Sequence, residues 1–244
     1  MSKTIDHYAH WSKIRDQKRS LQHREIESMR FLVKVFRDGE FLDVGCGDGL
    51  FLSKVMKVFP SQKCNGLDFS QEEVDLANKR GLNVKQGNIE EKFPFNSNKF
   101  NVVYAGEVIE HLFNPDHFLE EAGRILKKDG HLIISTPNLL AWFNRILVPM
   151  GVQPLFVEPS TKSKLVGAGP LKKFKKDSVP VGHVRIFTLE ALKDILEMHG
   201  FKILEVKGAV YESGFPSSVL KIDKIFSKRP TLASHFVILA KKVN

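Results

Sequence analysis

The sequence contains few cysteines and no long apolar segment near its start. Its 244 residues include only Cys46 and Cys64, which argues against a disulfide framework. Residues 1–20 are polar and charged, so they predict neither a secretory signal nor a membrane span. Internal repeats and low-complexity tracts are also lacking. We therefore expect an intracellular, cytoplasmic protein whose residues 1–244 form a single α/β domain.

Acidic residues are fewer than basic ones. The chain has 28 Asp and Glu against 37 Lys and Arg, a formal charge of +9. More than half of the excess lies between Glu158 and Arg185, where there are seven basic residues and two acidic ones. Such a charge suits nucleic acid, an anionic membrane surface or an acidic substrate, and it is also typical of a solvated loop.

Apolar periodicity divides the chain into alternating strands and helices. A leading segment, residues 1–38, carries helical spacing from about residue 12 to 37. The pattern then predicts strands at 41–44, 63–67, 83–86, 100–105 and 131–135, and helices at 50–58, from 70 onward and at 115–126. A Lys-Asp-Gly turn is expected at 128–130. This alternation predicts a doubly wound, mostly parallel α/β sheet.

The alternation stops after residue 138. The next regular pattern is a helix at 189–199, followed by strands at 202–206 and 234–241. These two late strands complete a seven-stranded sheet as an antiparallel edge. Residues 139–187 are therefore interpreted as an inserted lid or substrate segment within one domain.

A glycine-rich loop follows the first predicted strand. Gly45, Gly47 and Gly49 are spaced by two, and glycine allows positive φ and close approach of a ligand to main-chain N–H groups. A dinucleotide-binding fingerprint would need glycine where Leu50 stands, and the P-loop pattern is not met. A glycine-rich turn without a ligand remains the alternative.

An acidic residue, one apolar residue and G-x-G-x-G resemble motif I of class I S-adenosylmethionine (SAM)-dependent methyltransferases. The resemblance implies a Rossmann-like methyltransferase fold and SAM as cofactor, held by Asp43, Gly45, Cys46 and Gly47. Asp68 lies 21 residues after Gly47, where a carboxylate can accept both ribose hydroxyls. A helix-capping role is the alternative for Asp68.

Two further positions extend the resemblance toward adenine recognition. Asn88 stands where methyltransferases of this type usually carry Asp, and its carbonyl oxygen can still accept from the adenine amino group. Phe69 and Ile89 would lie on the two faces of the adenine ring. These assignments are what the resemblance implies.

The segment after the fourth strand carries Glu107, Glu110 and His111. With residues 40–138 as a whole, it resembles the branch of ubiquinone-biosynthesis O-methyltransferases and small-RNA 3′-terminal 2′-O-methyltransferases. Both groups use this E-x-x-E-H arrangement to hold a divalent metal, and His183 could match a further histidine of the RNA enzymes. If helical, positions 107, 110 and 111 converge on one face.

A bound Mg²⁺ or Mn²⁺ would orient an acceptor hydroxyl and lower its pKa. The alternative needs no metal. Glu107 would then contact the cofactor, Glu110 would satisfy helix-terminal amides, and His111 or His183 would act as general base. The metal ligands therefore stay undecided, while His111, His183 and Glu110 are the catalytic candidates.

The inserted segment and the residues around Tyr8 and Trp11 are the predicted lids. Residues 139–150 are strongly apolar and a basic run follows. Together, residues 139–176 predict either peripheral contact with an anionic membrane or a packed lid helix with a mobile loop. RNA is a less favoured partner because no RNA-binding module is recognisable, and DNA is not expected.

These features predict a SAM-dependent methyltransferase acting on a hydroxyl of a small molecule, such as a saccharide, a lipid or a quinone-type intermediate. One alternative is a metal-dependent RNA 2′-O-methyltransferase. Another is a catalytically silent SAM-binding or membrane-recruited scaffold.

Overall fold

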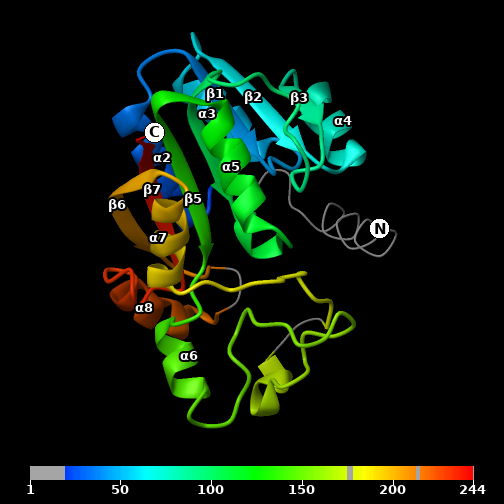
Figure 1. Ribbon diagram of the computed structural model, residues 1–244. Coiled ribbons are helices and arrows are strands. Elements are labelled where there is room, and N and C mark those ends of the chain that lie inside the picture. Colours follow the sequence, from blue (N-terminus) through cyan, green and yellow to red (C-terminus); the bar gives the residue numbers. More distant parts are fainter. Residues whose placement is uncertain (1–19, 175–177, 213–214, 244) are drawn as a thin grey trace.

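A seven-stranded sheet runs through the protein between two layers of helices (Figure 1). The computed structural model describes residues 20–174, 178–212 and 215–243. The strand order is β3-β2-β1-β4-β5-β7-β6. The strands are β1 (Glu40–Val44), β2 (Lys63–Asp68), β3 (Asn83–Gln86), β4 (Phe100–Gly106), β5 (Leu126–Pro137), β6 (Phe201–Ala209) and β7 (His235–Lys242).

Only β7 breaks the parallel arrangement, because it runs antiparallel to both β5 and β6. The predicted fold class, a mostly parallel doubly wound sheet with a late antiparallel pair, is confirmed. A consequence of this topology is that the first residues of β7 lie beside the carboxyl ends of β5 and β6. In sheets of this type that edge is where ligands bind.

Three of the described helices pack on one face of the sheet and two on the other. The helices are α2 (His23–Val35), α3 (Leu50–Val58), α4 (Gln71–Lys79), α5 (Pro115–Ile125), α6 (Trp142–Leu147), α7 (Leu189–Met198) and α8 (Ser217–Phe226), with short 3₁₀ turns η1 (Ile109–His111) and η2 (Gly169–Phe174). Apolar residues of α2, α3 and α4 share one core cluster, and those of α5 and α7 share the other. In β7, Val237 and Leu239 join the first cluster while Phe236 and Ile238 join the second, as the strand period of two requires.

Most predicted elements agree with the structure to within a residue or two. The leading helix is described from His23, where Gln22 and Glu25 form a capping box. The helix α4 begins after Ser70, whose hydroxyl accepts from the Glu73 amide. The predicted lid around Tyr8 and Trp11 lies outside the described residues, as do residues 175–177 of the basic run.

The predicted turn at 128–130 is an interruption inside a longer strand. Leu126 pairs with Phe100, and pairing resumes only at His131 opposite Val102. Residues 127–130 bulge out of the ladder of hydrogen bonds between β4 and β5. Asp129 within this bulge adopts a positive φ of 63°. β5 therefore begins earlier than the hydrophobic pattern alone indicated, because the apolar pattern does not register a strand that contains a bulge.

The inserted segment forms a separate layer beyond the carboxyl ends of the strands (Figure 1). Its helix α6 has 6 residues, shorter than the apolar run at 139–150 suggested. It packs against α8, a helix that the sequence did not predict within the long connection between β6 and β7. Among the helices that the structure describes, none is long and apolar enough to cross a membrane.

Candidate functional site

The glycine loop and the end of β2 are joined directly. Gly45, Gly47 and Gly49 all have positive φ, and a Cβ on Gly45 would lie 2.6 Å from Val108 Cγ2. The Gly47 amide donates to Asp68 Oδ2 at 2.7 Å. The structure thus brings together the two elements predicted to hold the adenosyl cofactor, and Asp68 supports the loop even without a ligand.

Asp43 lies buried beneath this loop. Its Oδ2 has no hydrogen-bond partner among the described residues. Burial raises the pKa of Asp43 well above its usual value, and the charges of Asp68 and Glu25 raise it further. A positively charged ligand group would relieve both effects, because it would stabilise the carboxylate. This group of neighbouring carboxyls suits a cationic ligand such as SAM, which carries an ammonium and a sulfonium.

The remaining cofactor candidates differ in their freedom to contact a ligand. The Cys46 side chain belongs to the core cluster under α2 and α3, so only its main chain is left to contribute. Phe69 is exposed and Ile89 packs on the edge of the core. Asn88 Oδ1 accepts from the Glu90 amide and its Nδ2 donates to Glu91. A second lone pair on Oδ1 can still accept, and adenine contact by these residues remains a prediction.

Glu107 does not share a helix face with Glu110 and His111. Its φ is 58°, and the 3₁₀ turn η1 begins only at Ile109. The predicted convergence on one helical face is therefore wrong, because the chain reverses at Glu107 before the turn starts. The Glu107 carboxylate instead contacts Arg24 Nε at 3.4 Å and His235 Nε2 at 3.2 Å.

The pKa values of the two acidic residues are shifted in opposite directions. Burial acts to raise the pKa of Glu107, but the charges of Arg24 and His235 outweigh it and hold that pKa far below its ordinary value. Glu110 is fully buried. Burial, with the charge of Glu107 adding to it, raises the pKa of Glu110 well above normal. The unlike surroundings of these neighbouring carboxyls therefore favour the ionised form of Glu107 and the protonated form of Glu110.

His111 and His183 lie side by side, with ring centroids 5.0 Å apart. His111 Nδ1 lies 3.1 Å from the Gly182 carbonyl oxygen, and His183 Nδ1 lies 2.8 Å from that of Phe156. Each ring therefore donates from Nδ1, so that in the neutral imidazole the lone pair is on Nε2. Burial lowers the pKa of His183, which favours the neutral, proton-accepting form.

One carboxylate in the inserted segment supports both histidines. Glu158 accepts from the amides of Val181 at 2.7 Å, Gly182 at 2.7 Å and His183 at 3.2 Å. The carbonyl oxygen facing His111 belongs to Gly182, and the His183 ring follows in the next residue. Glu158 therefore positions the backbone that orients both imidazoles.

Glu110, His111 and His183 form a candidate cation site. One ligand atom of each lies within 4.8 Å of the others. Glu110 Oε2 accepts from Thr136 at 2.9 Å, while Oε1 is buried without a partner among the described residues. A cation here would favour the carboxylate form of Glu110. The residues fit a divalent cation, and two imidazoles with one carboxylate suit Mn²⁺ better than Mg²⁺, which prefers oxygen ligands.

Sequence reasoning missed His235, Arg24 and Glu158. His235 opens β7 and is buried, and its Nδ1 has no partner within the described part of the chain. The predicted antiparallel edge held a usable signal, since the first residue of such a strand lies at the carboxyl ends of its parallel neighbours. Arg24 and Glu158 carried no comparable signal, because their roles depend on packing of distant segments.

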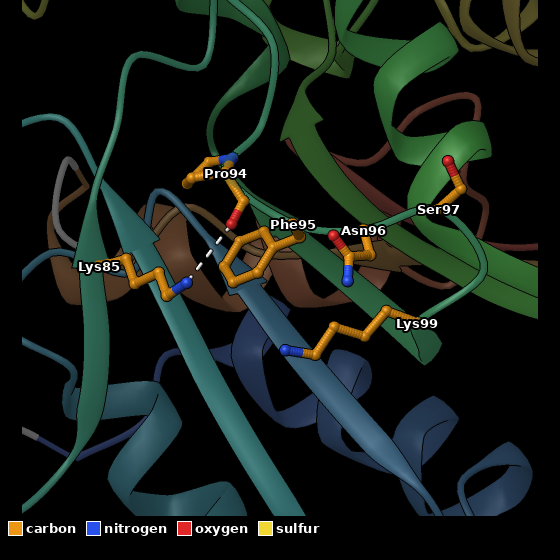
Figure 2. Close-up of a pocket in the computed structure, with 6 residues that line it drawn as sticks. All are labelled: Lys85, Pro94, Phe95, Asn96, Ser97 and Lys99. Carbon is orange, nitrogen blue, oxygen red and sulfur yellow. Dashed lines mark hydrogen bonds between the residues drawn. The ribbon is translucent and has the colours of Figure 1, made fainter.

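A surface cavity of about 410 Å³ has none of these residues in its lining (Figure 2). Its lining includes Lys85, Phe95 and Lys99, and the two ammonium groups lie 5.1 and 5.3 Å from the Phe95 ring centroid. The cavity brings together no carboxylate, imidazole or thiol. Its chemistry does not suit methyl transfer, so the carboxyl edge of the sheet remains the candidate site.

Comparison with known proteins identifies the family. Residues 16–206 match the family model described as methyltransferase domain. A demethylmenaquinone methyltransferase of Lactobacillus johnsonii is 31% identical over 175 residues, which cover 67% of this chain and 68% of that protein. A ubiquinone biosynthesis O-methyltransferase of Pelagibacter ubique is 28% identical over 109 residues, or 43% of this chain and 45% of the relative.

Solved structures share the fold at low sequence identity. One is the complex between the Haloferax volcanii Trm112 methyltransferase activator and a protein titled "the putative methyltransferase". The TM-score is 0.64 at 16% identity, and the match covers 98% of this chain and 97% of the other. A SAM-dependent methyltransferase from Thermotoga maritima has a TM-score of 0.60 at 19% identity, and the match covers 90% of this chain and 89% of that one. With a family model that matches most of its length, the chain belongs to the methyltransferase-domain family and is a SAM-dependent methyltransferase.

Proposed function

We propose that this enzyme methylates a hydroxyl group of a small molecule, and that a quinone-type aromatic ring is the acceptor that fits best. The observation that carries the proposal is the pair of imidazoles, His111 and His183, each with its lone pair on Nε2. A neutral imidazole can accept the proton of a phenol or alcohol. Glu110, His111 and His183 lie at the same sheet edge as the glycine loop.

Aromatic side chains support a planar acceptor. The Phe156 ring lies 5.8 Å from Phe143, 5.0 Å from Tyr211, 5.2 Å from His235 and 6.3 Å from His183. Ring centroids at such distances are typical of favourable aromatic packing. The names of two relatives, demethylmenaquinone methyltransferase and ubiquinone biosynthesis O-methyltransferase, point toward the same chemical class.

The protein's own contribution would be positioning and proton transfer. Bound SAM supplies an electrophilic methyl group. The Gly47–Asp68 contact and the buried carboxyl of Asp43 would fix the cofactor, while His183 or His111 would take the hydroxyl proton at Nε2. Alignment in a site shielded by the inserted segment can contribute about 7 to 11 kcal/mol of barrier lowering.

In an alternative to base catalysis, the Nε2 atoms of His111 and His183 would instead hold a divalent cation together with Glu110, and the cation would polarise the acceptor oxygen. This set also supports a second candidate function, metal-dependent 2′-O-methylation of RNA. The two functions differ in their response to salt. RNA binding would weaken steeply as salt rises, whereas binding of a small uncharged phenol would not.

The test uses methyl-labelled SAM with a panel of catechols, hydroquinones, saccharides and short RNAs. The proposal expects O-methylated product from a phenolic acceptor, and a loss of about 100-fold or more in turnover for His183→Ala, within the range for a general base. Methylation of RNA alone would instead establish the second candidate. SAM binding without transfer to any acceptor would contradict both and favour a silent SAM-binding scaffold.

A further inference from the structure

Helices α6 and α8 form one unit at the end of the molecule (Figure 1). Trp142 Nε1 of α6 donates to Asp223 of α8 at 2.8 Å. The Trp142 ring also stacks on Phe226, with centroids 5.2 Å apart and planes 16° apart. Their inner side belongs to the site, since Phe143 of α6 packs on the Phe156 ring.

The same unit also exposes aliphatic side chains. Exposed fractions are 53% for Ile146, 54% for Val148 and 66% for Met150 at the end of α6, and 43% for Ile222 and 65% for Ile225 on α8. Scattered apolar residues on a surface are ordinary, but several on one packed unit mark an interaction surface.

Charge around these residues is of one sign. Residues 139–174 and 215–230 contain nine basic residues and two acidic ones. Both acidic side chains point inward: Asp223 is fully buried against Trp142 and Ser234, and Glu158 binds the amides of residues 181–183. The charge presented outward is therefore basic.

The turn η2 adds lysines next to the end of α6. The Gln153 amide donates to the Gly167 carbonyl at 3.0 Å, and a Cβ on Gly169 would contact Val152 at 3.4 Å. This packing brings the start of η2 against the chain that follows Met150. Lys172 and Lys173, later in the same turn, are exposed. Exposed aliphatic residues and lysines thus occur together, as on proteins that bind the interface of a bilayer.

We propose that the outer surface of α6, α8 and η2 docks on a membrane containing anionic lipids. The lysines would meet the lipid headgroups, and Ile146, Val148, Met150, Ile222 and Ile225 would enter the acyl boundary. Aliphatic side chains favour lipid over RNA, because single-stranded RNA is usually bound by exposed aromatic rings that stack on bases. The sequence predicted membrane contact for residues 139–176 alone, and the proposed surface adds α8 to that segment. The proposal does not depend on methyl transfer.

Sedimentation with phosphatidylcholine vesicles, with and without phosphatidylglycerol, tests the proposal on the full chain without any acceptor. The wild type should bind only the anionic vesicles, and less at high salt. A fourfold Lys→Gln variant removes charge from the surface at Lys172, Lys173, Lys221 and Lys224. A matched control removes the same charge elsewhere at Lys57, Lys79, Lys128 and Lys202, all of which are exposed.

Each lysine near an anionic surface strengthens binding roughly fivefold, so the first variant should bind several hundredfold more weakly. The control should stay close to wild type. Met150→Ser with Ile225→Ser should also weaken binding. The control pair, Met198→Ser with Val58→Ser, changes exposed apolar residues at the ends of α7 and α3 and should not weaken it.

Three results would overturn the proposal: equal binding to neutral and anionic vesicles, equal losses in the two lysine variants, or no binding to anionic vesicles at low salt. Tighter binding to a single-stranded RNA than to vesicles, lost in the same lysine variant, would assign the surface to RNA. Because none of these measurements involves turnover, they leave the proposed O-methylation to its own test.

Discussion

Replacing Glu158 with alanine should release the backbone that holds both histidines. The carboxylate accepts three hydrogen bonds from consecutive amides, two of them at 2.7 Å. One bond to a charged group contributes about 1.5 to 3 kcal/mol, and bonds that share a carboxylate are not additive. We take about 3 kcal/mol for the three hydrogen bonds together. Their loss would lower the equilibrium ratio of the held to the released conformation of residues 181–183 roughly 100-fold.

Hydrogen exchange measures this release directly. Amides of Gly182 and His183 should exchange up to about 100-fold faster in Glu158→Ala, and kcat should fall while the dissociation constant for SAM stays near wild type. Glu158→Gln keeps one acceptor oxygen, so its exchange rates and kcat should lie between those of the wild type and Glu158→Ala. The control is Glu72→Ala, at an exposed carboxylate of α4. Unchanged protection at residues 181–183, or an equal loss of SAM affinity, would refute the positioning role.

The other predictions concern cofactor, metal and pH. Asp68→Ala should weaken SAM binding at least tenfold by calorimetry, since a charge-assisted contact contributes about 1.5 to 3 kcal/mol; unchanged affinity would remove Asp68 from the cofactor site. If the site uses a metal, EDTA and Glu110→Gln should each abolish turnover while SAM still binds, and full activity in EDTA would exclude that use. Hydrogen bonds from Arg124, more than offsetting burial, lower the pKa of Glu121. Glu121 therefore stabilises the fold above its ordinary pKa and loses this contribution as pH falls through the lowered value. Urea unfolding should show Glu121→Gln to be less stable than wild type at pH 7, with a gap that narrows in acid; a gap that widens would contradict this assignment.

The sheet was predictable because its signals are local. Apolar runs of strand length, the Gly45–Gly49 loop and the Ser70 cap each specify structure within a few residues. The antiparallel edge followed from the order of the last two strands. β5 was predicted too short, because the bulge before His131 hides a strand start that only pairing with Phe100 reveals.

The site was predictable only in part. Asp68, Glu110, His111 and His183 could be named because they follow strands or match a motif, and the structure places the last three together. The positive φ of Glu107 was not foreseeable, since non-glycine residues rarely adopt it. Contacts with Arg24 and His235 come from the two ends of the chain, and sequence spacing carries no information about such distant partners.

The most direct test of the account is to identify the product of methyl-labelled SAM. Labelled SAM would be incubated with the enzyme and with separated metabolite, lipid and RNA fractions of a cell extract, and the labelled compound would be characterised by mass spectrometry and NMR. The account predicts one labelled methyl group on a hydroxyl oxygen of a small aromatic molecule, lost in His183→Ala. A label found on RNA, on nitrogen or on no compound while SAM remains bound would contradict it.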